Sequence, residues 1–211
     1  MSLNAMGFSG IVDKLKHEFK ALTGQESKDK LFEAVNTFAD ENEAIEAFDK
    51  SKDKLFNVNG WSEMKGINST FILHDENGNK TDGNVKTGYF IKIELPGAKI
   101  ENWVKVTDVK DEKNLAEFIV HPSEKPKEKS NREAEVKHFF AKEASSTFRV
   151  IKDGKTIKAF EIGKNETINN NDEDSGNRTV INTLIAEGGW AGFQKIQWEK
   201  LTKYLIHLEE E

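Results

Sequence analysis

Apolar residues recur every three or four positions along the first part of the chain, a spacing that predicts amphipathic helices. The first such helix is expected between Ser9, a suitable N-cap, and Gly24, a suitable end. Its apolar stripe comprises Ile11, Val12, Leu15, Phe19 and Leu22. A second helix is expected from near Ser27, and residues 42–48 continue or restart it. Its stripe comprises Leu31, Phe32, Val35, Phe38 and Ala39.

A six-residue repeat falls within this helical stretch. Ser-Lys-Asp-Lys-Leu-Phe occurs at Ser27–Phe32 and again at Ser51–Phe56, 24 positions later. A solenoid needs a stack of roughly three or more units. We therefore interpret the repeat as chance or as a local duplication of a helix start. A turn signal at residues 59–61 ends the predicted helical N-terminal region, residues 1–60.

From residue 69 the apolar period changes to two, which predicts β-strands. The clearest is Val85–Leu95, whose alternate positions form one apolar and one mostly polar face, as in an antiparallel sheet covered on one side. An Asp153-Gly154 pair is a strong signal for a two-residue hairpin. About seven strands are predicted: Ser69–His74, Val85–Leu95, Asn102–Val109, Leu115–His121, Val136–Lys142, Ser145–Lys152 and Thr156–Gly163.

A long helical segment is predicted to end the chain, from about Arg178 to Leu208, with a kink at Gly188-Gly189. Polar loops precede it at residues 121–132 and 165–177. Helices, then a run of strands, then a helix indicate an α+β fold. The terminal helix is expected to pack on the antiparallel sheet. Residues 61–211 would hold the sheet and this helix, forming one compact unit with the N-terminal helices.

Composition narrows the possible classes of protein. With 36% hydrophobic residues, 14 Phe and 4 Trp, the chain can build a core, so disorder is not expected. The absence of Cys excludes a disulfide scaffold, and no apolar run is long enough to predict a membrane span. A net charge of -6 argues against nucleic acid as a partner. No signal peptide is evident, which favours a cytoplasmic protein and leaves export open.

No metal or cofactor site is predicted. The five histidines show no metal-ligand spacing, although the fold could bring His74, His121 and His138 together. The acidic loop at residues 169–177 lacks the spacing of an EF-hand, and so does Asp75–Asn79. Solvated turns account for both segments.

Catalytic motifs are also missing. The chain has no G-x-S-x-G elbow, no cysteine nucleophile and no phosphate-binding glycine loop. Ser145 and Ser146 lie near His138 in the sequence, but serines are common where strands start. An enzyme is therefore disfavoured, and a hydrolase-like site of dispersed histidines and carboxylates is the third hypothesis.

The strand run from Ser69 to Gly163, followed by a helix, resembles helix-grip folds of the START or Bet v 1 type. The matching helix carries Trp190, Phe193, Trp198, Leu201 and Leu205. This resemblance implies a curved antiparallel sheet that wraps a long C-terminal helix and encloses an apolar cavity. Those folds begin with a strand followed by two helices, whereas helices alone are predicted here before residue 60.

Aromatic residues suggest the leading functional hypothesis, a non-enzymatic protein that binds an apolar small molecule between the sheet and the terminal helix. The residues expected to face the ligand are Phe140, Trp190 and Phe193. Phe139 and Phe140 would lie on opposite faces of one strand, and Phe90 falls on a polar face. Such rings also fit the alternative, a protein-interaction or assembly component. The oligomeric state stays open.

Overall fold

The computed structural model describes residues 29–67, 69–94, 102–126, 143–165 and 189–209, with side chains of the last range described from Gln197. Within these ranges seven strands form one antiparallel sheet in the order β1-β7-β6-β5-β4-β3-β2. The strands are β1 (Lys30–Thr37), β2 (Thr70–His74), β3 (Phe90–Glu94), β4 (Asn102–Asp111), β5 (Leu115–Ser123), β6 (Ser145–Asp153) and β7 (Thr156–Lys164). The α+β class predicted from the sequence is confirmed.

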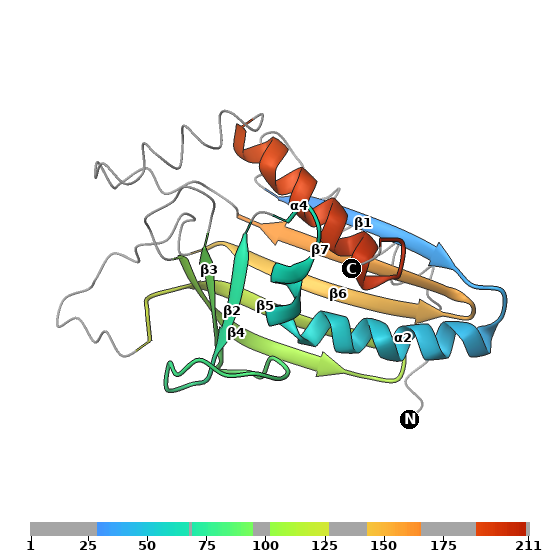
Figure 1. Ribbon diagram of the computed structural model, residues 1–211, viewed down its shortest axis with the longest axis horizontal. Coiled ribbons are helices and arrows are strands. Elements are labelled where there is room, and N and C mark those ends of the chain that lie inside the picture. The colour runs from blue at the N-terminus through green and yellow to red at the C-terminus, as the bar shows by residue number, and fades with distance from the viewer. Residues whose placement is uncertain (1–28, 68, 95–101, 127–142, 166–188, 210–211) are drawn as a thin grey trace, which may run out of the picture.

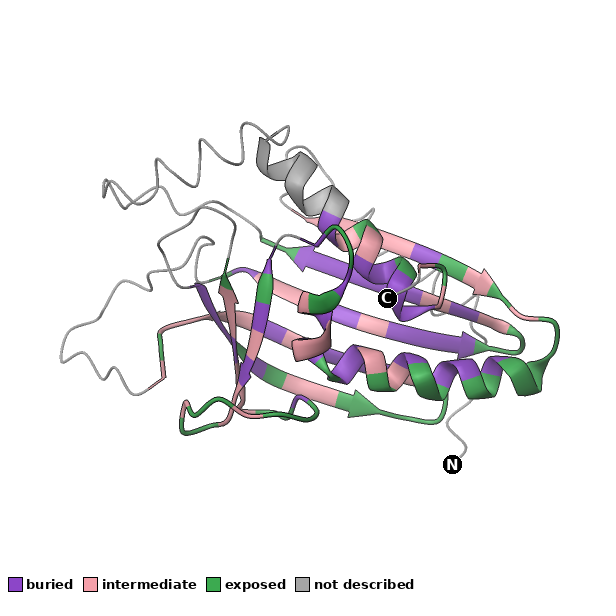
Figure 2. Cartoon of the chain, in the orientation of Figure 1, coloured by how far each residue is buried: buried purple, intermediate pink, exposed green. Residues whose placement is uncertain are grey.

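Helices cover one face of this sheet (Figure 1). The described ones are α2 (Glu41–Phe56), the 3-10 helix η1 (Val58–Glu63) and α4 (Gly189–Leu205). The main core lies between them and the sheet, and its largest fully buried side chains include Trp61, Phe48 and Phe118. Figure 2 shows the buried positions along the strands and on the sheet side of α2. No helix in the described ranges is long and apolar enough to cross a membrane.

Helix α2 follows from local sequence. Asp40 is its N-cap, and the carboxylate accepts hydrogen bonds from the backbone N–H groups of Asn42 and Glu43 at 2.8 and 3.0 Å. Glu43 in turn accepts from the N–H of Ala39 at 3.2 Å. The buried residues Ala44, Ala47, Phe48, Ser51, Leu55 and Phe56 recur at helical spacing. The helix predicted over residues 42–48 is therefore confirmed and extends to Phe56.

The predicted helix from Ser27 through Ala39 is wrong, because Lys30–Thr37 forms β1. This strand pairs along its whole length with β7, from Lys30 opposite Gly163 to Thr37 opposite Thr156. Both of its faces carry apolar residues, since Ala34 joins the main core and Leu31 packs on a smaller cluster on the other face. A short strand with two apolar faces lacks the period of two, so its pattern also fits a helix.

Glycine shortens the strand predicted over Val85–Leu95. Of the described residues in this segment, 85–94, Phe90–Glu94 forms a strand, while Gly88 has a φ of +93° and its N–H donates to the carbonyl of Val106 at 2.8 Å. A positive φ is accessible to glycine at little cost and breaks the extended backbone. The predicted hairpin is confirmed, with Asp153 pairing with Thr156 across a turn whose Gly154 has a φ of +53°.

All or a large part of three predicted elements lies outside the described residues. These are the helix between Ser9 and Gly24, the strand Val136–Lys142, and residues 178–188 of the terminal helical segment. Six of the seven predicted strands have counterparts among the described residues, where β1 is the seventh strand, and the prediction for Val136–Lys142 stays untested. The terminal helix is described only over Gly189–Leu205, and the turn that follows it contains His207 with a φ of +62°.

His207 links the C-terminal turn to α2 through polar contacts. Its Nε2 lies 2.9 Å from the carbonyl oxygen of Ala47 and 3.2 Å from Oγ of Ser51. Burial lowers the pKa of His207; the hydrogen bond to Ala47 opposes this change, and the nearby charges of Lys54 and Lys50 add to it. The neutral imidazole, donating from Nε2 to the carbonyl, is therefore the form that suits this contact.

We expect this contact to make stability depend on pH. In an unfolded chain histidine titrates near pH 6.5, so between the lower folded pKa and about 6.5 the unfolded state binds more protons. The contribution of His207 is fully present above about pH 6.5 and is lost as the pH falls through the folded pKa. Urea unfolding at a series of pH values should show this decline, and His207→Gln should flatten it. Superimposable profiles for the two proteins would contradict this role.

Candidate functional site

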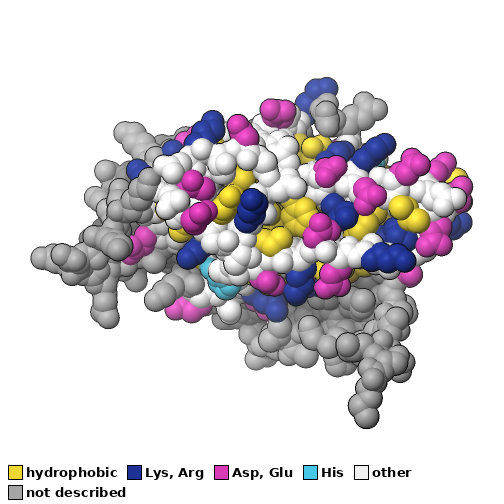
Figure 3. Space-filling model, turned by 90° about the horizontal axis from the view of Figure 1, so that it is seen from below, with side chains coloured by type: hydrophobic (Ala, Val, Ile, Leu, Met, Phe, Trp, Pro, Cys, Tyr) yellow, Lys and Arg dark blue, Asp and Glu magenta, His cyan; other side chains and the backbone are white. Residues whose placement is uncertain are grey.

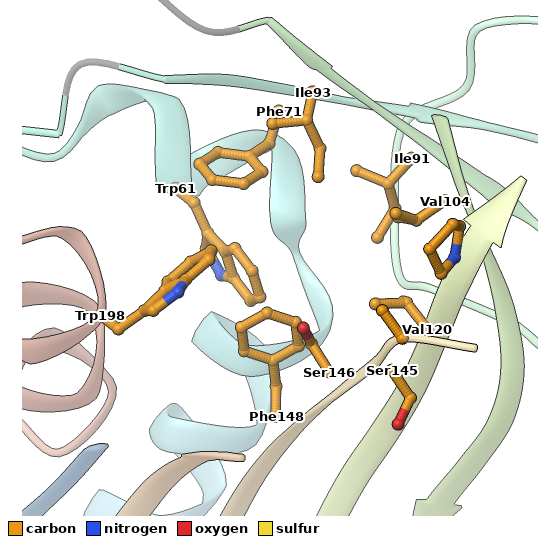
Figure 4. A pocket seen from close by; sticks show the side chains of 12 residues that line it. Trp61, Phe71, Ile91, Ile93, Val104, Val120, Ser145, Ser146, Phe148 and Trp198 are labelled. Carbon is orange, nitrogen blue, oxygen red and sulfur yellow. The ribbon is translucent and has the colours of Figure 1, made fainter. Parts of the chain in front are cut away.

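An apolar pocket opens between the sheet and the helices (Figure 4). Its walls come from η1, α4, strands β2 to β6 and the residue before β6. The residues that line it are Trp61, Phe71, Ile91, Ile93, Val104, Val120, Pro122, Ala144, Ser145, Ser146, Phe148 and Trp198. Elements far apart in the sequence thus contribute to a single hollow.

One wall consists of aromatic rings in mutual contact. The Trp61 ring lies 5.5 Å from Phe71 at an interplanar angle of 73° and 5.0 Å from Phe148 at 60°. Trp198 of α4 completes the wall, with its ring 5.4 Å from Phe148 and 6.4 Å from Phe71. Edge-to-face and tilted pairs of this kind add to the energy of burial, so this wall is held in a defined geometry.

The two tryptophans differ in their polar groups. The indole N–H of Trp61 donates to the backbone carbonyl of Lys54 at 2.8 Å, which ties the ring to the last turn of α2. The indole N–H of Trp198 is buried, and no described residue accepts a hydrogen bond from it. An unpaired buried donor destabilises the folded state. Trp61 is therefore the better anchored of the two rings.

The facing wall is aliphatic and belongs to β3, β4 and β5. Ile91 and Ile93 lie two apart on β3 and so share a face, and Ile91 pairs with Val104 of β4. Val120 of β5 continues the same surface, because Val106 of β4, on the same face as Val104, pairs with it. Alternation along neighbouring strands in register thus builds this wall.

Two serines at the start of β6 supply the hydroxyl groups of the lining. Successive residues of a strand point to opposite faces, and the oxygens of Ser145 and Ser146 diverge accordingly (Figure 4). The Ser146 oxygen points toward the rings of Trp61 and Phe148, whereas the Ser145 oxygen points away from them. Only Ser146 therefore presents its hydroxyl to the pocket.

The pocket is small and opens to solvent. Its volume is about 60 Å³, and about 520 Å³ when the open space at its mouth is included. Protein interiors are packed as densely as organic crystals and contain few voids larger than a water molecule. None of the described lining residues carries an ionisable side chain, so this lining offers an apolar surface rather than acid or base groups.

The residues predicted to face a ligand cannot be placed in this pocket. Phe140 lies outside the described residues, and the side chains of Trp190 and Phe193 in α4 are not among those described. The described lining brings in Trp61, Phe71 and Phe148, which the sequence did not single out. Phe148 could have been found, because it shares a strand face with Ser146 within a correctly predicted strand.

His74 and His121, the two histidines of the proposed group that the structure describes, do not lie close together. His74 pairs with Phe90, Phe90 with Lys105, and Lys105 with His121, so these residues form a row across four strands. Neighbouring strands lie about 4.8 Å apart, which separates the two histidines by about 14 Å. His138 lies outside the described residues. Among those described, no group of His, Asp and Glu could hold a metal ion.

Comparison with known proteins finds likeness at the level of fold. No known family and no curated protein matches the sequence. A solved structure of a hypothetical protein from Helicobacter pylori matches with a TM-score of 0.51 and 12% identity, over 97% of this chain and 98% of that one. At this identity the match shows a shared fold alone.

Two further structures match with lower scores. Norcoclaurine synthase from Thalictrum flavum covers 87% of this chain and 98% of its own, at 13% identity and a TM-score of 0.37. The Aha1 dimer from Colwellia psychrerythraea covers 86% and 99%, at 10% identity and a TM-score of 0.38. Scores below 0.5 carry no further argument about this chain.

The order of elements agrees with the helix-grip resemblance more closely than the sequence predicted. A strand, β1, precedes α2 and η1, six strands follow, and α4 lies across the sheet (Figure 1). The helix-grip fold starts with a strand and two helices, so this part of the departure came from assigning β1 to a helix. The helix predicted between Ser9 and Gly24 lies outside the described residues.

Proposed function

We propose that this protein binds a small apolar molecule in the pocket between its sheet and its helices. The main support for this proposal is the lining of the pocket, in which an aromatic wall faces an aliphatic wall across an open space. None of the described lining residues has an ionisable side chain. Concave, mostly apolar sites between packed layers are the usual form of small-molecule sites.

Energetics support this function. Closing the gap would bury more apolar surface, at about 25 cal/mol per Å². The core nevertheless keeps the space open between Phe71, Phe148 and Trp198 on one side and Val104 and Val120 on the other. A ligand that fills it would gain contacts with both walls and lose little, because the rings already hold one another in place.

Filling the pocket should abolish binding. We expect p-xylene, titrated into isotopically labelled protein and followed by NMR, to bind at one saturable site. Val120→Phe would place a ring in the space and prevent this binding. The matched control is Ile119→Phe, whose ring would lie on the opposite face of the same strand. Binding that survives Val120→Phe, or no binding to the natural chain, would contradict the proposed site.

Phe140, Trp190 and Phe193 remain part of this proposal. If they also face the ligand, replacing each by alanine should weaken p-xylene binding about tenfold, because each change removes a ring from the contact surface. The same NMR titration measures this effect. A lower melting temperature with unchanged affinity would identify them as core residues instead.

The alternative, an interaction or assembly component, finds less support in the described surface. Its exposed large apolar side chains are Val35, Ile45 and Leu208, and they lie on β1, on α2 and in the turn after α4. On the face shown in Figure 3, apolar side chains are interspersed with lysines, arginines and acids. A partner surface would instead present a contiguous apolar patch.

A further inference from the structure

Among the described lining residues, Ser146 is the serine whose hydroxyl points into the pocket (Figure 4). Ser146 pairs with Val120 of β5 and with Gly163 of β7, which fixes its backbone near one end of the sheet. Its side chain lies on the same face as Phe148, two residues further along β6, and its oxygen points toward the pocket rings (Figure 4). A ligand in the pocket would therefore meet one hydroxyl group among carbon surfaces.

This hydroxyl keeps capacity for a ligand. A serine hydroxyl has one donor and two acceptor lone pairs, so it can form a further hydrogen bond besides the interaction it already makes within the protein. A polar ligand group placed elsewhere against the rings or the aliphatic wall would lose its water without a partner, which is costly. The favourable position for such a group is beside Ser146.

The described lining also disfavours a charged group on the ligand. None of its described residues is ionisable, so a carboxylate or ammonium group would enter without a counter-charge from the wall. An unpaired charge costs far more to bury than a neutral hydroxyl does. The described part of the wall therefore disfavours fatty-acid-like anions and amine cations.

We propose that the ligand is a neutral ring compound with a single hydroxyl-type group that donates a hydrogen bond to Oγ of Ser146, while the ring packs between Phe148 and the aliphatic wall. This inference rests on the proposed binding function and specifies its substrate class. Ser146 is then the residue that determines specificity, and the aromatic wall supplies most of the affinity.

A pair of probes of the same shape tests this assignment. p-Cresol and p-xylene differ by a hydroxyl in place of a methyl group, and Thr107→Val is the matched control for Ser146→Ala because it removes an exposed hydroxyl of β4 outside the lining. In NMR titrations Ser146→Ala should weaken p-cresol binding about fivefold, the usual effect of one hydrogen bond. Its p-xylene affinity should stay unchanged, and Thr107→Val should alter neither affinity.

The outcomes separate this inference from the proposed function. If both probes bind and Ser146→Ala leaves p-cresol affinity unchanged, or Thr107→Val weakens it equally, the role of Ser146 is refuted while the pocket stands. If 4-methylbenzoate binds as tightly as p-cresol, the neutral class is wrong. If neither p-cresol nor p-xylene binds to the natural chain, the proposed function fails together with this inference.

Discussion

A chain carrying Trp61→Ala is expected to unfold with a free energy about 3–5 kcal/mol below that of the natural protein. Only 1% of Trp61 is exposed, and its ring contacts Phe71, Phe118 and Phe148. The substitution would empty the space at the centre of the core and leave the Lys54 carbonyl without its indole donor. Cavity formation and a lost buried hydrogen bond both destabilise the folded state.

Urea unfolding measures this effect, with Trp61→Phe as the control. Phenylalanine keeps a ring against Phe148 but removes the indole N–H, so its cost should be clearly smaller. A loss below about 1 kcal/mol for Trp61→Ala would mean that the surrounding rings collapse into the vacated space, and that Trp61 does not organise the core.

The second large effect is expected at Glu117, a carboxylate that is 1% exposed on β5. Its Oε1 accepts a hydrogen bond from Nζ of Lys110 at 2.5 Å, and its Oε2 accepts from the guanidinium of Arg149. Burial alone would raise the pKa of Glu117, but the hydrogen bond from Lys110 and the charge of Arg149 outweigh it, so the pKa is lowered. The carboxylate is therefore ionised and doubly paired.

Glu117→Gln should lower the free energy of unfolding by about 3 kcal/mol. Removing one partner of a buried ion pair leaves the other charge uncompensated, and the partial exposure of Lys110 and Arg149 moderates the loss. The contribution of Glu117 is fully present above the unfolded pKa, near 4.5, and is lost as the pH falls through the lower folded value. The variant should therefore differ most from the natural chain at neutral pH.

Chemical denaturation at pH 7 and at pH 3 tests both statements. Glu112→Gln provides the control, because Glu112 is exposed in the turn between β4 and β5. It should change stability by less than about 0.5 kcal/mol. If Glu117→Gln is as mild as this control, solvent rather than the ion pair satisfies Arg149 and Lys110.

The repeated hexapeptide shows that local sequence alone does not determine secondary structure in this protein. Within its two copies, Asp29–Phe32 runs into a strand while Asp53–Phe56 forms the last turn of α2. The same four-residue sequence thus adopts an extended backbone in one copy and a helical backbone in the other. Its intrinsic secondary-structure propensity therefore did not determine the conformation of either copy. In the first copy, backbone pairing with the edge of β7 stabilises the strand. In the second copy, burial of Leu55 in the core stabilises the last turn of the helix.

The candidate site was accessible to sequence reasoning only in part. The predicted strand Ser145–Lys152 contains Phe148, which the sequence did not single out, and the predicted helical stripe includes Trp198. Trp61, by contrast, served only as a turn marker at the end of the predicted helices. Its place in the aromatic wall depends on η1 packing against β2, which brings the ring to Phe71.

Sequence by itself determined the elements whose pattern has one clear period. Alternating residues specified the strands β4 to β7, the Asp153-Gly154 pair specified the hairpin, and helical spacing after Asp40 specified α2. Only the tertiary structure decided that Lys30–Thr37 is a strand, that His74 and His121 stay apart, and that seven elements converge on one pocket. Those outcomes depend on pairing and packing between segments that are distant in the chain. The local pattern of apolar residues contains no information about such contacts.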